Sequence, residues 1–382
     1  MDSLLFVSDY NIDPQDEGQL TLEISNLSFF KDNEWNGDVT PGYTLPGLWI
    51  QPKISYQALP QLTVEAGVHS LIYSGTTKYP NTIYQDIAEW KGTQYHSGTH
   101  LLPYFRAHVQ LNKLHFILGN LYGGNNHRLP DPLYSSELNM TADPESGLQM
   151  LYDNKRLHLD LWANWESFIF KGDHHRESFV FGANTQYSFT PRLKASLAIL
   201  AHHRGGEIDT FTVNSVNTVM NASFGVSYSS PVNLKWLHSY ELSAHILGYA
   251  QESGKMWPID KGWAFYAEGR MRFAWGLSAK VGYILNRNFI SLLSYPYYGC
   301  LSLDERYKNA TYNHPQMLNA QIDWSRSLGK NYALGVRAEM FQYIPNGPLK
   351  TTTNSFVAQK SSNSLSFGIF LRATPKFLLK KL

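Results

Sequence analysis

The stretch WAFYAEGRMRFAW, from Trp263 to Trp275, decides the fold. Its odd-numbered positions are apolar or small, with an aromatic residue at each end, whereas its even-numbered positions carry Glu268, Arg270 and Arg272. A period of two residues is that of a β-strand. The segment is also longer than the about 9 to 11 residues that a tilted strand needs to cross a bilayer. This pattern predicts a membrane-barrel strand whose apolar face meets lipid and whose polar face meets the lumen.

The same alternation recurs along the chain in segments of about 10 to 14 residues, which exceeds the usual strand length of soluble sheets. Clear examples are Leu157 to Trp165, Phe179 to Phe189, Tyr332 to Met340 and Leu365 to Leu371. A soluble β-sandwich would also alternate, but it would not keep such long strands with aromatic residues at both ends of the apolar face. Only a closed barrel satisfies all backbone groups of strands in lipid.

Short turns and longer polar connections follow one another strictly. Seven turns are short, for example Leu59–Gln61 and Thr190–Arg192, and eight connections are long, for example Arg204–Asn217 and Arg287–Gln316. This order predicts an all-β, transmembrane, up-and-down antiparallel β-barrel of 16 strands, with 14 as the alternative. The short turns would face the periplasm, and the long loops would face the outside of the cell.

The barrel is predicted to span residues 19–374. Residues 1–18 are interpreted as a periplasmic N-terminal tail, and residues 375–382 as a C-terminal tail. The long connection Gly123 to Ser146 is expected to fold inward as a constriction. The N-terminus carries no convincing secretory signal, so we interpret the chain as an exported protein of a Gram-negative outer membrane whose signal has been removed.

The composition agrees with a membrane barrel. Charged residues make up 16% of the 382 residues, against about 25% in typical soluble domains. Aromatic residues reach 14%, and Tyr and Trp favour membrane interfaces. The 32 basic and 31 acidic residues nearly balance, which argues against nucleic acid as a partner. Cys300 is the single cysteine, which excludes an intrachain disulfide and a cysteine-based zinc site.

The inward faces of the predicted strands carry acids and bases in equal number, so the lumen is predicted to be either a weakly selective channel or a closed interior of ion pairs. The predicted pore-lining residues are Lys53, Glu65, Arg106, Asp160, Glu166, Glu241, Glu268, Arg270, Arg272, Lys280, Asp323, Arg337 and Glu339.

No cofactor or metal is predicted. The acidic loop from Asp131 to Glu145 contains oxygen ligands suited to calcium but lacks the ligand order of an EF-hand, so calcium binding stays open. The spacing between His96 and His100 would suit a metal on a helix, but its surroundings are typical of a loop. Linear nucleophile motifs are absent, and the strand histidines fall mainly on inward positions, which argues against a Ser–His site on the lipid-facing wall.

Three stretches carry a resemblance to a known group. They are LGNLYGGNNHRLPDPLYSSELNMTADPESGLQML (Leu118 to Leu151), LWANWESFIFKGDHHRESFVFG (Leu161 to Gly182) and NFISLLSYPYYGC (Asn288 to Cys300). They resemble outer-membrane β-barrel proteins of Bacteroidota, including porin-like ones. The resemblance implies the barrel fold and the outer membrane, and it transfers no catalytic residues. Many such barrels end on an aromatic residue, whereas here the last predicted strand ends near Thr374 and the chain continues to Leu382.

The leading functional expectation is a porin-like channel for passive diffusion of small polar solutes, without enzymatic activity. One alternative is an accessory barrel in a larger outer-membrane complex, where partner proteins would bind for protein assembly, secretion or lipoprotein export. The other is a lipid-modifying barrel enzyme. In all three cases outer-membrane lipid and lipopolysaccharide surround the protein.

Overall fold

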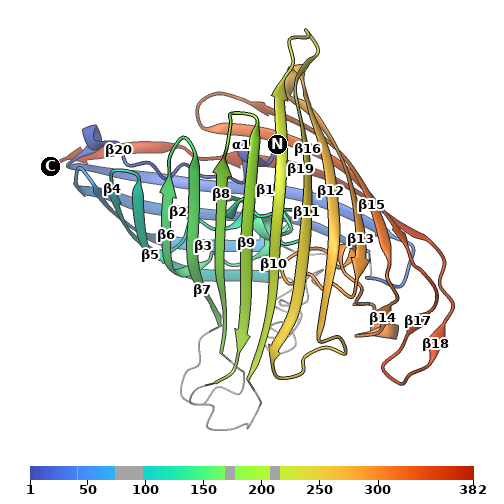
Figure 1. Cartoon of the computed structure of the whole chain (residues 1–382). Coiled ribbons are helices and arrows are strands. Elements are labelled where there is room, and N and C mark those ends of the chain that lie inside the picture. Colours follow the sequence, from blue (N-terminus) through green and yellow to red (C-terminus); the bar gives the residue numbers. More distant parts are fainter. Residues whose placement is uncertain (41, 74–97, 168–176, 207–215) are drawn as a thin grey trace.

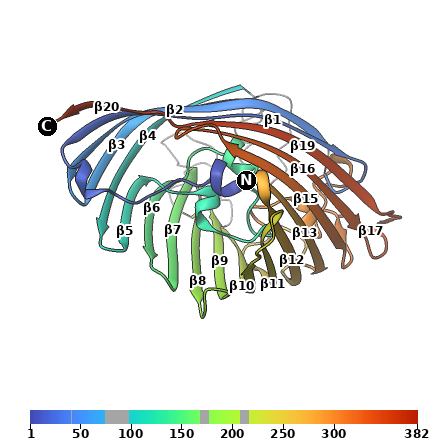
Figure 2. The ribbon, with the colours of Figure 1, turned by 90° about the horizontal axis from the view of Figure 1, so that it is seen from above.

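A closed antiparallel β-barrel forms the wall of the molecule (Figures 1 and 2). The structure, a computed structural model, describes residues 1–40, 42–73, 98–167, 177–206 and 216–382. In this part of the chain the wall has 16 strands, each paired with its neighbour in chain order, and β1 (Gln19–Trp35) pairs with β19 (Ser362–Ala373) to close the ring. The predicted fold and strand number are therefore confirmed.

The wall continues after β1 with β2 (Tyr43–Leu59), β3 (Leu62–Tyr73), β4 (Gly98–Leu111), β5 (Leu114–Asn120), β6 (Ser146–Asp153), β7 (Leu157–Ser167) and β8 (Ser178–Ser188). Its second half consists of β9 (Leu193–Arg204), β10 (Asn217–Pro231), β11 (Leu237–Ser253), β12 (Lys261–Phe273), β13 (Leu277–Arg287), β15 (Gln316–Ser327), β16 (Tyr332–Ile344) and β19. A separate three-stranded sheet contains β14 (Thr311–Tyr312), β17 (Leu349–Lys350) and β18 (Phe356–Val357).

Short helices accompany the strands. The described α-helices are α1 (Asp2–Leu5) and α3 (Leu138–Thr141), and the 3₁₀ helices are η1 (Pro14–Asp16), η3 (Gly124–His127), η4 (Ala274–Gly276), η5 (Pro296–Tyr298) and η6 (Glu305–Tyr307). None of the described helices is long and apolar enough to cross a membrane.

The strand faces follow the predicted alternation. In β12, Trp263 is 48% exposed and Met271 49% exposed, whereas Ala264 and Tyr266 are buried towards the lumen. The strand periodicity confirms that the apolar, aromatic-ended face is the outer one. All seven predicted short turns lie between consecutive wall strands. Most of the predicted long connection Arg204–Asn217 lies outside the described residues.

Both ends of the chain contact the barrel. After Pro375, β20 (Lys376–Lys381) pairs with Gln19–Glu23 of β1 and so extends the wall at the side of the short turns. At the other end, α1 lies inside the ring (Figure 2), where Asp2 forms an ion pair with Arg337 at 2.5 Å.

The lumen of the described barrel is filled by chain from at least three segments, residues 1–8, 121–145 and 288–310. They contact one another, since the Ser135 amide donates to the Leu293 carbonyl at 2.8 Å and the Asn126 amide group donates to the Ser8 carbonyl at 2.7 Å. Buried aromatic side chains of the third segment, such as Tyr297, pack against Phe341 of the wall with ring centroids 4.7 Å apart. Apolar and polar contacts together hold these segments in place.

We expect the purified protein in a planar bilayer to show no stepwise conductance of porin size, because a 16-strand barrel conducts only where its lumen is open to water. The measurement is the current across the bilayer at fixed voltage. A variant lacking residues 1–8 serves as comparison, since it removes one of the filling segments. Porin-sized steps from the intact chain would contradict a filled lumen and restore the channel interpretation.

Candidate functional site

A histidine on the segment between β5 and β6 forms the centre of the candidate site. After β5 the chain leaves the wall, forms η3 inside the lumen and then α3, and returns to the wall at β6. The last residue of η3 is His127, and the following Arg128 has the left-handed backbone conformation that ends the short helix. This turn places the His127 ring against the inner face of β7.

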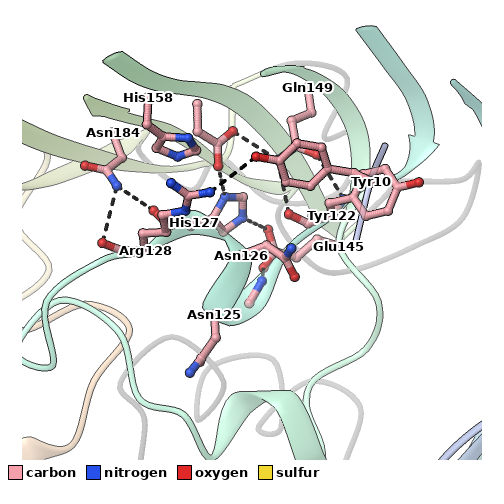
Figure 3. A network of polar contacts seen from close by, with 12 residues as sticks. Tyr10, Tyr122, Asn125, Asn126, His127, Arg128, Glu145, Gln149, His158 and Asn184 are labelled. Carbon is pink, nitrogen blue, oxygen red and sulfur yellow. Dashed lines mark hydrogen bonds and ion pairs between the residues drawn. The ribbon is translucent and has the colours of Figure 1, made fainter. Parts of the chain in front are cut away.

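His127 lies between two carboxylates (Figure 3). Its Nδ1 is 2.7 Å from Oδ2 of Asp160 on β7, and its Nε2 is 2.8 Å from Oε2 of Glu145. The ring stacks on the indole of Trp162 with centroids 3.7 Å apart. His127 is 1% exposed and Asp160 is fully buried, so water does not screen this pair.

Further hydrogen bonds hold both carboxylates and the histidine backbone. The Gln149 amide donates to Oδ1 of Asp160 at 3.0 Å, and the backbone amide of Gly124 donates to Oε1 of Glu145 at 2.8 Å. The Asn184 side chain donates to the His127 carbonyl at 2.6 Å. Because β6, β7 and β8 each contribute a partner, the ring orientation depends on three wall strands.

The two carboxylates decide the charge of the histidine. Burial lowers the pKa of His127, but the charges of Glu145 and Asp160 outweigh burial and raise this pKa to about 10. Burial raises the pKa of Glu145, but the imidazolium and the Gly124 amide outweigh it and hold this pKa below its usual value. The resting site therefore holds an imidazolium between two carboxylates. Since the folded pKa of His127 is the raised one, its contribution to stability is complete below its ordinary pKa of 6.5 and is lost as the pH rises towards 10.

A second cluster lies nearer the short turns. Oδ2 of Asp153 is 2.8 Å from the Arg128 guanidinium and 3.1 Å from Nδ1 of His158, and it also accepts a hydrogen bond from Tyr10 at 2.8 Å. Figure 3 shows Tyr10, Arg128 and His158 beside the His127 cluster. These contacts join the N-terminal segment to the wall.

A cavity of about 170 Å³ lies beside His127, between the inner segments and strands β2, β3, β4, β7 and β8. Its polar lining comes from side chains that include Arg106, His127, Glu145, Asn164 and Glu166. Its apolar lining includes Phe6, Trp49, Leu121, Leu138, Trp162 and Val180. A lining of this kind suits a ligand with a polar group joined to a hydrocarbon chain.

A serine, a histidine and a glutamate also meet at the long-loop ends of β7, β8 and β9. Ser178 Oγ lies 2.8 Å from Nε2 of His202 and donates to Oε2 of Glu166 at 2.9 Å. Glu166 Oε2 lies 3.2 Å from that same Nε2, so serine and acid share one ring nitrogen. In a catalytic triad the acid instead contacts the other ring nitrogen. This trio is therefore the weaker candidate for the chemistry.

The structure places the predicted pore-lining residues on the inner side of the wall and joins most of them in ion pairs. Glu65 contacts Lys53 at 3.0 Å and Arg106 at 3.1 Å. Asp160 and Glu166 lie in the two histidine clusters described above. Glu65 thus lies between two bases on the inner side of the wall, as expected for a lumen of ion pairs.

The remaining predicted residues lie on the opposite side of the lumen. Ion pairs join Glu268 to Arg270 at 3.1 Å, Asp323 to Arg337 at 2.8 Å, and Lys280 to Asp131 of the inner segment. Glu339 is buried nearby, and Glu241 and Arg272 line a separate cavity of about 460 Å³ together with Glu268 and Arg270. The paired arrangement agrees with a closed interior better than with an open selective pore.

The acidic loop pairs with bases of this chain. Glu137 contacts Lys31 at 2.7 Å and Asp143 contacts His100 at 2.9 Å. Among the residues that the structure describes, no group of three or more histidine, cysteine or acidic side chains is arranged to hold a metal ion. His96 lies outside the described residues.

Sequence reasoning did not assign a role to His127. The signals available were a histidine after two glycines and two asparagines, in a connection expected to fold inward, and Asp160 on a predicted inward face. Neither signal shows that the two residues meet, because they are 33 positions apart in the chain.

Solved outer-membrane proteins share the fold. The chain is similar to OprD from Pseudomonas aeruginosa, with a TM-score of 0.51, 11% identity and coverage of 99% of this chain and 98% of that one. It is also similar to a loop L8 deletion mutant of OmpT from Vibrio cholerae, with a TM-score of 0.53, 11% identity and coverage of 94% and 100%. At such identities these likenesses show the barrel fold, and outer-membrane localisation agrees with them. No curated protein matches the chain.

A family model gives more specific information. Residues 12–382 match the Lipid A 3'-O-deacylase-type family, which is an enzyme family. The expectation that the protein has no enzymatic activity is therefore wrong, and the porin-like interpretation is less well supported than its lipid-modifying alternative. The sequence misled here because the absence of a linear nucleophile motif does not exclude an enzyme. Because the match extends over nearly the whole barrel, the chain belongs to the Lipid A 3'-O-deacylase-type family.

Proposed function

We propose that this protein hydrolyses an acyl ester of a lipid A-type glycolipid in the outer membrane. The observation that carries the proposal is the buried His127–Asp160 pair, 2.7 Å apart, on the wall of a cavity with both polar and apolar lining. The family match supports this substrate class. An ester of a lipid has its reacting carbon where the hydrocarbon chain meets the polar headgroup, and such a cavity accommodates both parts.

The reaction is the addition of water to the ester. Nε2 of His127 takes a proton from a water molecule while the water oxygen attacks the carbonyl carbon, and Asp160 holds the ring and stabilises the imidazolium that forms. The bond from this carbon to the sugar oxygen then breaks, and the imidazolium returns the proton to that oxygen. The products are a fatty acid and a free sugar hydroxyl.

In the resting structure Glu145 occupies the position that the reaction needs. Its carboxylate bridges Nε2 of His127 and the backbone amide of Gly124. When the carboxylate moves away, the ring nitrogen loses the charge that keeps it protonated, and the Gly124 amide becomes available as a donor. A preorganised backbone amide is the kind of group that stabilises the oxyanion of ester hydrolysis. Glu145 thus blocks Nε2 of His127 and the Gly124 amide until the substrate takes its place.

We expect the substitution Glu145→Gln to move the acid limb of the pH–rate profile to lower pH. Glu145 is a main cause of the raised pKa of His127, so its neutralisation lowers this pKa and makes the basic form available at lower pH. The measurement is the release of fatty acid from lipopolysaccharide in mixed micelles between pH 4 and 10, followed by mass spectrometry.

The matched control is Glu166→Gln, which neutralises an acid of the same cavity next to His202. It should leave the acid limb in place. If only Glu166→Gln moves the limb, and Ser178→Ala abolishes release, the Ser178–His202–Glu166 trio carries the chemistry and the assignment to His127 is wrong.

A further inference from the structure

The barrel wall is lower at one place than elsewhere. β5 and β6 have 7 and 8 residues, whereas β4 and β7 on either side have 14 and 11. The β4–β5 ladder starts only at Arg106–Gly119, although β4 begins at Gly98. Likewise the β6–β7 ladder ends at Gly147–Asn164, although β7 continues to Ser167. At the long-loop side, β4 extends beyond β5, and β7 extends beyond β6. We call this interruption of the wall between β4 and β7 the notch.

Two glycines form the floor of the notch. Gly119 and Gly147 pair with each other across β5 and β6, and their φ angles are +94° and +153°. A Cβ atom at Gly119 would lie 2.3 Å from the Phe105 carbonyl oxygen, and one at Gly147 would lie 2.1 Å from that of Ala163. The positive φ angles and the close approach both require glycine, so the ladders to β4 and β7 end at residues that the backbone geometry specifies.

Side chains complete both ends of the ladders. Oδ1 of Asn120 accepts a hydrogen bond from the Phe105 amide at 2.9 Å, and Oδ1 of Asn164 accepts one from the Ser146 amide at 2.9 Å. Pro103 lies on the stretch of β4 above the floor, and proline occurs in sheets mainly at edges because it donates no ladder hydrogen bond. These features satisfy backbone groups at an interruption of the wall, which is costly in lipid without such partners.

The cavity beside His127 lies next to the notch. Above the floor of the notch, the chain leaves β5 for the lumen and returns from the lumen to β6. The end of β5 and the start of β6 stay bonded to each other there, since the Leu121 amide donates to the Glu145 carbonyl at 2.9 Å. The cavity is lined from one edge of the notch by Tyr104 and Arg106 of β4, and from the other edge by Asn164 of β7. The same cavity therefore reaches both edges of the notch.

The outer rim of the notch is apolar. Leu101 and Phe105 on β4 are 69% and 48% exposed, and Leu148 just below the floor on β6 is 60% exposed. Side chains of this kind on the outside of a barrel lie in the hydrocarbon band of the bilayer. The notch lies at the long-loop ends of the strands, which face the outer leaflet. Because β5 and β6 are both absent at the height of the notch, the backbones of β4 and β7 are three strand spacings apart there, about 14 Å.

We propose that the notch is a lateral entrance through which one acyl chain of an outer-leaflet glycolipid passes from the bilayer into the cavity beside His127. This inference rests on the proposed ester hydrolysis. The chain slides past the apolar rim, its ester arrives at Glu145 and His127, and the sugar headgroup stays on the long-loop side. Lipid then reaches the catalytic pair without leaving the membrane.

The entrance is tested first without reference to activity. The protein, as His127→Gln so that no ester is consumed, is placed in vesicles that contain a phospholipid with a diazirine on its acyl chain, and labelled residues are mapped by mass spectrometry after illumination. Labels on cavity residues such as Leu121 and Leu138 support the entrance. Labels confined to outward-facing residues such as Leu148 and Phe181 overturn it.

The second test blocks the notch. Leu102 on β4 lies above the floor, on the inner face opposite His69, and it is not part of the cavity lining. Leu102→Cys, modified with a bulky maleimide, should lose activity on lipopolysaccharide by about 100-fold, because the ester no longer reaches its position. It should keep its activity on the water-soluble ester p-nitrophenyl acetate. Cys300 is fully buried and does not compete for the reagent.

The matched control is Ser243→Cys with the same label, which places equal bulk in the separate cavity on the other side of the lumen. It should leave both activities unchanged. The entrance would be overturned if the label at position 102 reduced the activities on lipopolysaccharide and on p-nitrophenyl acetate equally. It would also be overturned if the label changed neither activity. If the unmodified wild-type protein hydrolyses neither ester, the proposed function fails, and the diazirine experiment still decides whether lipid enters the notch.

Discussion

Replacement of His127 by glutamine is expected to reduce the release of fatty acid from lipopolysaccharide by about 1000-fold, within the range typical of a general base. Glutamine keeps polar atoms near Asp160 and Glu145 but cannot take up a proton. The loss should appear in kcat more than in KM, because the histidine acts on the water and not on the lipid chain. Initial rates in mixed micelles, with product identified by mass spectrometry, measure both parameters.

The control for this variant is His158→Gln. His158 is also a buried histidine with an acidic partner, at 3.1 Å from Asp153, but it does not line the cavity. It should retain most of the activity. A His127→Gln protein that is folded and still hydrolyses the lipid at the wild-type rate would remove the proposed base. Activity lost equally in both variants would indicate a structural role for the whole network.

Replacement of Arg337 by alanine is expected to destabilise the folded barrel by about 3 to 5 kcal/mol, the usual cost of breaking a buried ion pair. Its guanidinium contacts Asp323 of β15 at 2.8 Å, Asp2 of α1 at 2.5 Å, and the Ser136 hydroxyl of the inner segment at 2.8 Å. Alanine leaves Asp323 buried without this base. The free energy of unfolding from urea titrations, followed by tryptophan fluorescence, measures the effect.

The matched control is Arg326→Ala, because Arg326 lies on β15 at an exposed position and carries the same charge. Exposed substitutions of this kind usually change stability by less than about 0.5 kcal/mol. The double variant Arg337→Leu and Asp323→Leu should recover much of the loss, since it removes both buried charges. An Arg337→Ala protein as stable as the wild type would show that water reaches Asp323.

The wall of this protein is predictable from local patterns. From Trp263 to Phe273, where β12 ends, the apolar odd-numbered positions face outwards and the even-numbered ones face the lumen, because the strand period of two is a property of the backbone. The predicted strand is two residues too long, since Ala274–Gly276 form the 3₁₀ turn η4. The seven short turns are predictable for the same reason, since each connects two neighbouring strands. Closure of the wall then follows from the need to pair every backbone group in lipid.

The inner segments and the site follow from longer-range contacts. Whether the connection from residue 121 to residue 145 extends outwards or folds into the lumen depends on partners that the closed ring supplies, such as the carbonyl group of Asn139, which accepts from Trp49 Nε1 at 2.9 Å. The same holds for α1, which is held by Arg337 from a strand more than 300 positions later in the chain. No local period encodes such pairs.

The sequence by itself therefore determined that the chain is an outer-membrane barrel with polar residues inside, because alternation and aromatic ends are local properties of each strand. It also indicated that lumenal charge is balanced. Only the tertiary structure decided that these charges pair, that the lumen is filled, and that His127 meets Asp160 and Glu145 beside a cavity. The physical reason is that a closed sheet brings residues of distant strands and inner segments within hydrogen-bond distance, and this proximity has no signal in the spacing of residues along the chain.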